Sequence, residues 1–502
     1  MAKIKKVIEY LFLLFLFFLP WQTVWIWREG MLNGGKWQYG TYGLYGSEII
    51  LWLILILQLI VWAGARKYSI DLKSINRKKL LAVLAIWIFF LWASLSIFWS
   101  ADKPLAFYWW FKLAEGIILF FLILNFKFNI KKINWALVSA GAVQAVLAIG
   151  QFLSQAVAAN KWLGLAGHRP GDVGAVVIEA SGFWLRPYGS FPHPNILGGF
   201  LLLGFFLALI IYFKYYLAKP KMKLLLIALI LIISAGIFFS FSRSAWLGAG
   251  VGYLIFLFAY ILRWWQNYFC CNLSFLAATS SGWRKKILTV AAATAHIFLL
   301  ALLVSLKKSK ISQQNSFATI SLYLKPEPGS AKKLYLKELW QITASIIILI
   351  GCLSVIYWPL LFTRFSAREN LERISLARRA DLRKGAEQII KDKWLLGAGL
   401  GNYTWYLYKQ NPNLKTNEYQ PVHNIFLLVW AELGLIGFFI FLFFYFYAII
   451  FSVKNKNLAG LVLWPALGLI GLFDHYLWTQ YVGIMIWWIG LAFVFRQVDF
   501  ES

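Results

Sequence analysis

The sequence predicts an all-α fold, a polytopic bundle of transmembrane helices with a mainly helical extracytoplasmic loop. Hydrophobic residues make up 61% of the 502 residues and charged residues only 14%. A soluble domain carries about 25% charged residues. Apolar runs of about 18 residues or more, long enough to cross a bilayer, recur along the whole chain. We therefore expect an integral membrane protein with about 12 spans.

The spans are expected in order of the apolar runs. They lie near residues 7–27, 48–65, 80–99, 109–126, 134–157, 194–213, 222–241, 244–262, 338–362, 424–452, 458–475 and 477–495. The first run follows a basic N-terminus, as in a signal peptide, but it lacks a small-residue cleavage site. It is therefore interpreted as an uncleaved helix.

These spans divide the chain into four regions. Residues 1–157 hold the N-terminal transmembrane helices, and residues 158–262 hold an outer loop and the central helices that carry Arg186 and Arg243. Residues 263–337 form a basic insert whose path across the membrane the sequence leaves open. Residues 338–495 contain a second outer loop at 363–423 and the C-terminal transmembrane helices.

The charge balance sets the expected orientation. Lys and Arg outnumber Asp and Glu by 49 to 20, and the positive-inside rule accounts for this excess without nucleic-acid binding. With the N-terminus inside, residues 28–47, residues 158–192 and the turn at Ser242-Arg243 fall outside. A single span at 286–306 would put residues 363–423 inside, whereas two crossings or none would put them outside. The Lys-rich stretch 307–337 favours the outside placement.

The loop 363–423 is the place to look for chemistry, because a bilayer tolerates irregular polar backbone only outside the hydrocarbon or along a protein cavity. Residues 367–392 have apolar positions at helical spacing and predict one or two amphipathic helices over the membrane face. The glycines Gly397, Gly399 and Gly401 should then end the helix. His423 and Asn424 stand at the start of the next span.

Three arginines are candidate anion ligands. Arg243 interrupts two apolar runs with little polar cover, so it is either a functional residue or an arginine that reaches lipid headgroups. Arg186 ends a loop before Asn195, where a ligand contact and a salt bridge are equally open. Arg379 belongs to the amphipathic stretch, whose charges are mostly a solvated face. A guanidinium group offers a planar fork to phosphate oxygens, so these arginines suit a diphosphate.

His423 is the candidate general base among the five histidines, because imidazole titrates near neutral pH. The alternative is a hydrogen-bonded histidine at the membrane interface. No His or carboxylate cluster has metal-ligand spacing, and no P-loop or G-x-S-x-G motif is present. The three cysteines fit neither a zinc site nor a disulfide framework. We expect a site without a metal or another cofactor.

Four segments together resemble the bacterial O-antigen ligase/polymerase family of integral membrane proteins, over roughly residues 185–475. The segments are Arg186 with Gly189-Ser190-Phe191 and Pro194-Asn195; Ser242-Arg243-Ser244-Ala245-Trp246; Arg379 with Gly397-Ala398-Gly399-Leu400-Gly401-Asn402-Tyr403; and His423-Asn424 with Glu432-Leu433-Gly434. Trp394 departs from the proline usual in the family, and the insert 263–337 is unusually long.

The resemblance implies a C-type glycosyltransferase-like protein of the cytoplasmic membrane. Members of the family transfer a glycan from an undecaprenyl-diphosphate carrier to an acceptor hydroxyl at the outer face, and are taken to be metal-independent. Arg243 and Arg379 match the arginines assigned to the carrier diphosphate. His423 matches the histidine assigned to acceptor activation. Asn195, Asn424, Gly397 and Gly399 would support the site.

Two functions from different classes remain. The first is an inverting glycan transferase, in which His423 deprotonates the acceptor while Arg243 and Arg379, together with Arg186, hold the diphosphate. The second is a non-enzymatic polysaccharide exporter or a flippase for lipid-linked sugars. A carrier should place ionisable residues along a path within its spans, whereas these residues gather at one expected face. The acceptor (lipid A core, a growing glycan or a protein hydroxyl) is left open.

Overall fold

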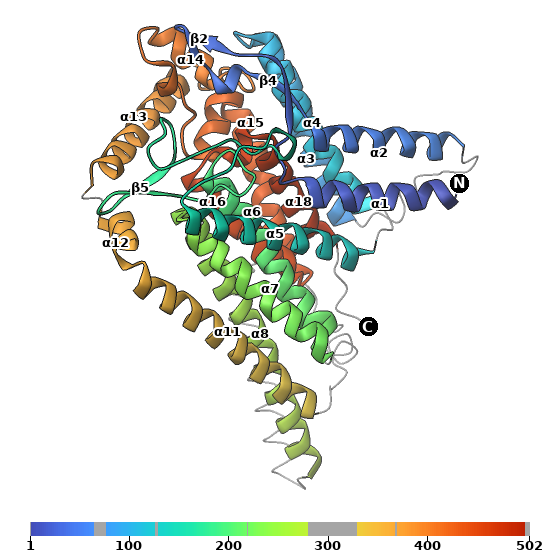
Figure 1. The fold of residues 1–502 in the computed structure, drawn as a ribbon. Coiled ribbons are helices and arrows are strands. Elements are labelled where there is room, and N and C mark those ends of the chain that lie inside the picture. The colour runs from blue at the N-terminus through green and yellow to red at the C-terminus, as the bar shows by residue number, and fades with distance from the viewer. Residues whose placement is uncertain are drawn as a thin grey trace. The chain divides into compact units, whose positions relative to one another are not determined.

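The computed structural model describes residues 2–64, 77–125, 129–217, 219–279, 329–366 and 369–496. The chain forms two compact units. One comprises Met1–Tyr253 with Ser345–Ser502, and the other comprises Leu254–Ala344. Helices dominate the described residues, which confirms the all-α prediction (Figure 1). The second unit holds the end of α8 and the start of α11, and most of the predicted insert 263–337 lies outside the described residues.

The helices are joined by loops, and the long connections between α1 and α2 and between α5 and α6 carry small antiparallel strand pairs. The helices are α1 (Ala2–Phe18), α2 (Gly46–Ala63), α3 (Arg77–Trp99), α4 (Lys103–Asn125), α5 (Ile130–Ser154), α6 (Pro194–Ile211), α7 (Pro220–Phe239), α8 (Arg243–Thr279), α11 (Gly329–Ile356), α12 (Trp358–Ser366), α13 (Asn370–Asp392), α14 (Tyr403–Gln410), α15 (Ile425–Lys454), α16 (Leu458–Phe473), α17 (Tyr476–Thr479) and α18 (Tyr481–Phe495). The strands are β1 (Val24–Arg28), β2 (Met31–Leu32), β3 (Gly35–Lys36), β4 (Tyr42–Tyr45), β5 (Val177–Glu179) and β6 (Phe183–Leu185).

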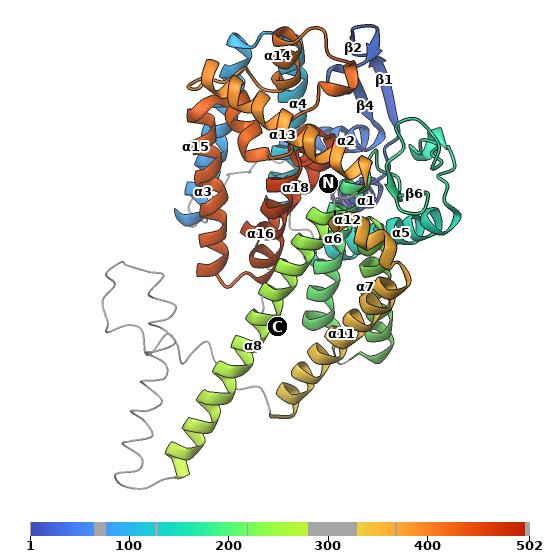
Figure 2. The ribbon, with the colours of Figure 1, turned by 90° about the vertical axis from the view of Figure 1, so that its left-hand side faces the viewer.

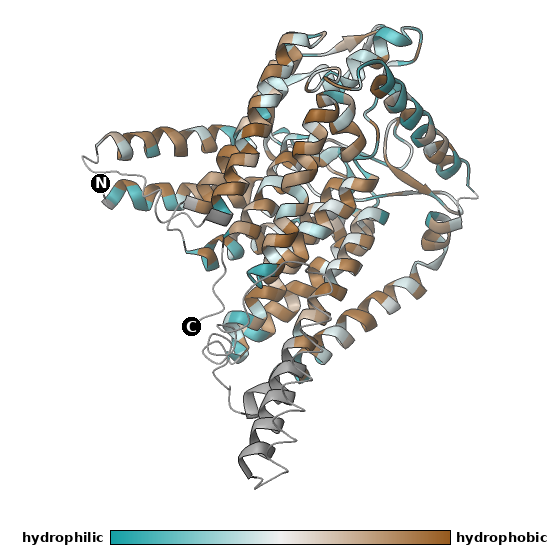
Figure 3. Ribbon diagram, turned by 180° about the vertical axis from the view of Figure 1, so that it is seen from behind, coloured by the Kyte–Doolittle hydropathy of each residue, from teal (hydrophilic) through white to brown (hydrophobic). Residues whose placement is uncertain are grey.

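Within the described part of the chain, nine helices are long and apolar enough to cross a membrane. They lie in α2 to α8, α11 and α15, and α16 and α18 are shorter apolar helices. Each of them overlaps a span expected from the sequence, so the polytopic prediction is confirmed. Figure 3 shows the apolar residues along these helices and the polar residues along α13, which covers one end of the bundle.

Three of the expected spans are wrong in their limits. The first was expected to reach residue 27, but α1 ends at Phe18 and β1 pairs with β4 instead. Pro20 cannot continue the helical hydrogen bonds, and the β-branched and aromatic residues that follow favour a strand. The expected span 338–362 breaks at Tyr357 between α11 and α12, and the last expected span breaks at Gln480, which is extended.

Helix α6 is the centre of the larger unit. All of its residues from Pro194 to Ile211 are buried, as expected for a helix that is apolar on every side. It packs against α5, α7 and α16. Gly141 of α5 faces Gly204 of α6 so closely that a Cβ at Gly141 would lie 3.5 Å from the Gly204 Cα. Small residues let membrane helices approach in this way. Helix α18, equally buried, packs against α4 and α16.

The connecting segments meet at one end of this unit, where Figures 1 and 2 show α13, α14 and the β1–β4 hairpin. Asn33 Nδ2 donates to the Leu414 carbonyl at 3.0 Å. Leu371 N donates to Glu179 Oε2 at 3.1 Å. The segments 28–47, 158–192 and 363–423 therefore share one face with the start of α8. The alternative span at 286–306 lies outside the described residues.

The glycine-rich segment is explained by a break in α15. Gly434 has φ +66°, which interrupts the helix, and frees carbonyl groups in the preceding turn. Ala398 N donates to the Ala431 carbonyl at 2.9 Å, and Gly399 N donates to the Glu432 carbonyl at 2.8 Å. A Cβ at Gly397 would lie 2.3 Å from the Glu432 carbonyl oxygen. Helix α13 ends at Asp392, before the first of these glycines, so they do not end it as predicted; they allow two backbones to dock.

Substituting Gly434 by alanine should destabilise the protein, because the new Cβ would lie 2.1 Å from the Leu395 carbonyl oxygen and the residue would keep a positive φ. A strained position of this kind costs about 1–3 kcal/mol. Thermal unfolding in detergent measures the effect. Gly150→Ala in α5 is the matched control, since its Cβ would meet no atom within 4 Å. Equal unfolding temperatures for the two variants would contradict the docking role.

Candidate active site

The turn between α7 and α8 forms the base of the site. Phe241 has φ +47°, so the chain leaves α7 in a left-handed conformation, and the last carbonyl groups of α7 are left without helical donors. Arg186 donates from Nε (3.0 Å) and from Nη2 (2.8 Å) to the Ser240 carbonyl. Arg364 Nη2 donates to the Phe241 carbonyl at 3.1 Å. A helix C-terminus favours cations by its dipole as well.

The loop that carries Arg186 is held by α5. Gln151 Oε1 accepts from Tyr188 N at 3.0 Å and from Gly189 N at 2.8 Å, and its Nε2 donates to the Gly189 carbonyl at 2.8 Å. Gly189 has φ +60°, which a glycine adopts without strain. Arg186 is only 4% exposed, and burial lowers its pKa well below the ordinary value, with Arg364 adding to the effect.

Asn195 connects this arginine to an acidic residue. Its Oδ1 accepts from Arg186 Nη2 at 2.7 Å, and its Nδ2 donates to Asp474 Oδ2 at 2.6 Å. Asn195 stands in the first turn of α6, where His193 caps the helix by accepting from Asn195 N at 3.1 Å. The predicted supporting role of Asn195 therefore has a geometric basis, a bridge between two loops that are far apart in the sequence.

His423 lies at the other end of this bridge. Its ring packs edge-on against the His475 ring, with 4.8 Å between the centroids. Its Nδ1 is buried and, in the described part of the chain, has no hydrogen-bond partner. Burial lowers the pKa of His423, Asp474 opposes this shift, and Arg379 and Arg378 add to it. A neutral imidazole with a free ring nitrogen near pH 7 is a suitable proton acceptor.

Asp474 and His475 were not predicted as site residues. Burial raises the pKa of Asp474, but the imidazoles of His423, His475 and His193 outweigh it, so the net shift is downward. Burial lowers the pKa of His475 to about 3, with His423 as the next cause. Both residues lie in the short turn between α16 and α17. The sequence did mark Asp474, because it is a charged residue between two apolar runs, and the same feature made Arg243 a candidate.

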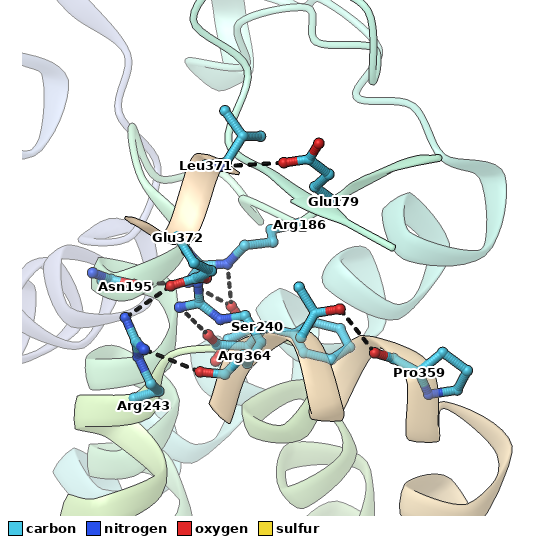
Figure 4. A network of polar contacts seen from close by, with 11 residues as sticks. Glu179, Arg186, Asn195, Ser240, Arg243, Pro359, Arg364, Leu371 and Glu372 are labelled. Atoms are coloured by element: carbon cyan, nitrogen blue, oxygen red, sulfur yellow. Dashed lines mark hydrogen bonds and ion pairs between the residues drawn. The ribbon is translucent and has the colours of Figure 1, made fainter. Parts of the chain in front are cut away.

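Arg243 is paired rather than free. Figure 4 shows its guanidinium group beside Glu372, with 3.2 Å between Arg243 Nη2 and Glu372 Oε2. Its Nη1 donates to the Arg364 carbonyl at 3.0 Å. Glu372 also forms an ion pair with Arg364. Neither Arg364 nor Glu372 was predicted from the sequence, although Arg364 follows an apolar run as Arg243 precedes one.

Arg379 projects from α13, the helix expected over residues 367–392, which the structure places at Asn370–Asp392. Burial lowers the pKa of Arg379, while Asp474 opposes the shift and Arg243 adds to it. Arg379 thus lies within electrostatic reach of both Asp474 and Arg243. No hydrogen bond or ion pair of its side chain is found among the described residues, which leaves its donors available to a ligand.

Asn424, Gly397 and Gly399 have structural roles. Asn424 caps α15, since its Oδ1 accepts from Phe426 N at 2.9 Å and from Leu427 N at 3.0 Å. Gly397 N donates to the Lys393 carbonyl at 2.8 Å, and Gly399 N is bound to α15 as described above. These N–H groups are therefore not available to cradle an anion. They position His423 and the end of α13.

His423, Asp474 and His475 are also the residues most able to hold a metal ion in the described part of the chain. Their donor types suit zinc, and the three candidate ligand atoms lie within 4.8 Å of one another. The nearby arginines disfavour a divalent cation at this position.

An apolar cavity of about 400 Å³ is lined in part by residues that neighbour Arg243 and Arg364 along the chain. Its lining residues are Phe205, Ser234, Ile237, Phe238, Trp246, Ala249, Gly250, Tyr253, Ile346, Ile350, Ser354, Leu361 and Phe365. Trp246 stands in the first turn of α8 with Arg243, and Phe365 follows Arg364. The Trp246 and Phe365 ring centroids are 6.0 Å apart. The site thus joins a cationic polar end to an apolar channel.

The fold and the site define a polytopic helical membrane protein with a cationic, histidine-bearing site at one face of its helix bundle. Residues 227–442 match the family model described as O-antigen ligase. This match confirms the resemblance for that region and supports glycan transfer by a membrane enzyme. It includes Arg243, Arg379 and His423, whereas Arg186, Asn195 and Asp474 lie outside it. No curated protein matches the chain.

The burial of His475 predicts acid sensitivity. Its pKa of about 3 lies below the ordinary value of 6.5, so the unfolded chain binds the proton first as the pH falls. Stability is therefore highest above pH 6.5 and declines below it, by up to about 1.4 kcal/mol per pH unit for one group. His475→Asn should flatten this decline in a series of thermal unfolding measurements.

The matched control is Thr479→Val. It removes the hydroxyl that lies 2.7 Å from His475 Nδ1 but keeps the titratable ring. This variant should keep the wild-type slope of stability against pH. The assignment is wrong if His475→Asn retains the full slope.

Proposed function

We propose that this protein transfers a glycan from an undecaprenyl-diphosphate carrier to an acceptor hydroxyl at the outer face of the cytoplasmic membrane, with inversion and without a metal ion. The observation that carries the proposal is the connection of His423, through Asp474 and Asn195, to the arginine cluster that adjoins an apolar cavity. A transferase of this kind needs a base and an anion site within one substrate length of each other.

The donor headgroup is assigned to the arginines. Arg379 has free donors, Arg243 is partly exposed, and Arg186 holds the loop beneath them by its bonds to Ser240 and Asn195. A guanidinium group remains charged when it is partly buried and presents paired donors to phosphate oxygens. Charge that develops on the leaving diphosphate would therefore be stabilised by groups already oriented for it.

The carrier's polyprenyl chain is assigned to the apolar cavity. The cavity begins at Trp246 and Phe365, each within one helical turn of an arginine of the site. An apolar channel that continues a cation site fits a lipid with an anionic headgroup better than it fits a soluble nucleotide sugar. Burial of each CH₂ group of the lipid contributes about 0.8 kcal/mol.

Acceptor activation is assigned to His423. In the step we propose, His423 takes the proton of the acceptor hydroxyl, whose oxygen attacks the anomeric carbon of the glycan. The bond between that carbon and the phosphate oxygen breaks, and undecaprenyl diphosphate leaves with the electron pair. Asp474 would stabilise the imidazolium that forms, as a carboxylate does beside a histidine base. Attack from the face opposite the leaving group gives inversion.

His423→Ala should lower the rate of glycan transfer about 10²–10⁴-fold, the usual contribution of general-base catalysis. Donor binding should be retained, since the arginines are unchanged. The assay incubates purified protein with a lipid-linked oligosaccharide and with candidate acceptors (lipid A core, a glycan or a protein), and identifies both products. Near-wild-type transfer by the variant would show that another group is the base.

The same assay separates a transferase from the second candidate, a flippase or exporter. Transfer releases undecaprenyl diphosphate in an amount equal to the glycan moved, whereas a carrier releases none. The acceptor that gains the glycan distinguishes a ligase from a polymerase.

Asp474→Asn should move the acid limb of the pH–rate profile. The negative charge of Asp474 raises the pKa of His423, so its removal should lower that pKa further and shift the limb to lower pH. The maximal rate should fall as well, because the imidazolium loses its counter-ion. Asp392→Asn, which changes an exposed carboxylate bonded to Gln388 and Gln410, should leave the limb in place. A lower rate with an unmoved limb in Asp474→Asn would mean a purely structural role.

A further inference from the structure

Glu372 occupies the position where two arginines of the site converge. Its Oε1 is paired with Arg364 and its Oε2 lies 3.2 Å from Arg243 Nη2. The side chain is only 7% exposed, against 28% for Arg243. Figure 4 shows the carboxylate between the two guanidinium groups, above the turn that holds Arg186. A buried carboxylate in this position presents two anionic oxygens to two arginines, as a phosphate group does.

The carboxylate fills this position incompletely. Within the described residues, Arg364 Nε is buried with no hydrogen-bond partner, and Glu372 Oε2 accepts no hydrogen bond although it faces Arg243. A buried donor left unpaired is destabilising. A tetrahedral phosphate has more acceptor oxygens than a carboxylate, spread in three dimensions, and can reach donors that the planar group leaves unpaired.

The net charge of the site also favours a phosphate ligand. The guanidinium groups of Arg186, Arg243, Arg364 and Arg379 interact with the carboxylates of Glu372 and Asp474. Four positive groups facing two negative ones leave two positive charges uncompensated, and the two negative charges of a doubly esterified diphosphate would neutralise them. If Glu372 withdraws, the excess rises, which suits the more negative diphosphate that leaves after transfer.

We propose that Glu372 is an internal stand-in for a phosphate of the donor. Its carboxylate occupies the anion-binding position between Arg243 and Arg364 when no donor is bound, and the incoming diphosphate displaces it. This inference rests on the proposed function, because it takes the donor to be a diphosphate. It makes Arg364 a ligand of that diphosphate and Glu372 a competitor that sets how tightly any anion binds.

Displacement of the Glu372 carboxylate by a diphosphate requires rotation of the Glu372 side chain and not a movement of α13. The first turn of that helix is anchored by the bond from Leu371 N to Glu179 Oε2 at 3.1 Å, and Glu179 belongs to β5. Glu372 is therefore held at the rim of the site by its backbone, while among the described residues its side chain is held by the two ion pairs. A carboxylate that only orients the two arginines would have the same contacts, but its removal would weaken pyrophosphate binding or leave it unchanged, whereas removal of a competitor strengthens it.

The test measures binding of inorganic pyrophosphate to the full-length protein in lipid nanodiscs by calorimetry. Glu372→Gln removes the competing charge at almost constant size and should bind pyrophosphate about tenfold more tightly, or more, than the wild type. Glu372→Asp keeps the charge but withdraws it by one carbon, and should fall between the two. Glu387→Gln is the control, since Glu387 pairs with Arg383 on the exposed side of the same helix and should bind as the wild type does.

A fold measurement accompanies the binding assay, because removal of one partner of a buried ion pair is destabilising. Glu372→Gln should unfold at a lower temperature than the wild type without ligand, and pyrophosphate should raise its unfolding temperature by more than it raises that of the wild type. Failure of pyrophosphate to do so would overturn the inference.

The outcomes also separate this inference from the proposed function. Equal or weaker binding by Glu372→Gln, with normal binding by the wild type, would overturn the stand-in and leave the donor assignment intact. Absence of pyrophosphate binding in both the wild type and Glu372→Gln would overturn both.

Discussion

The site depends on hydrogen-bond acceptors that compensate the charge of buried guanidinium groups at one end of the helix bundle. The left-handed turn at Phe241 ends α7 and presents the carbonyl groups of Ser240 and Phe241, which accept from Arg186 and Arg364. Without these acceptors, arginines at such low exposure would be too costly to keep. The same turn begins α8 and so places Arg243 beside them. One irregular turn therefore determines where three positive charges converge.

A second irregularity positions His423, the proposed base. The break of α15 at Gly434 lets the glycine-rich segment dock by backbone hydrogen bonds, which ties the end of α13 to the beginning of α15. Helix α13 carries Arg379 and Glu372, and the residue before the α15 cap is His423. The break thus couples the two halves of the site through rigid backbone contacts rather than through flexible side chains. Precise placement of this kind is what a transfer between two bound substrates requires.

Asp474 joins the two halves electrostatically. It is bridged to Arg186 by Asn195 and lies among His423, His475 and Arg379. A carboxylate buried among cations and imidazoles keeps its charge, and it can stabilise a second positive charge when His423 is protonated. At the anion site we propose, the contact of Glu372 with Arg243 and Arg364 would have a comparable role, because its carboxylate would compensate charge until a ligand binds. In both places, carboxylates of the protein balance its own cationic groups.

Much of the fold and part of the site followed from the sequence alone. Apolar runs predicted the membrane helices because bilayer thickness demands a minimum length, and the periodicity of residues 367–392 predicted α13. Arg243, Arg379 and His423 stood out because charge and imidazole are rare between apolar runs. Asp474 and Arg364 carried the same signal, but each is isolated in the sequence, and only the packing of α6, α12 and α17 gives them partners.

Tertiary structure alone decided what each polar group contacts. The sequence could not separate Arg243 bound to lipid headgroups from Arg243 paired with Glu372, since the pair is distant along the chain. Nor could it tell that the glycines serve backbone docking, because that role exists only beside the unwound turn of α15. Periodicity and composition determine which segments enter the membrane, since burial there depends on local hydropathy. The site depends on non-local hydrogen bonds, and only the packed helices bring their donors and acceptors together.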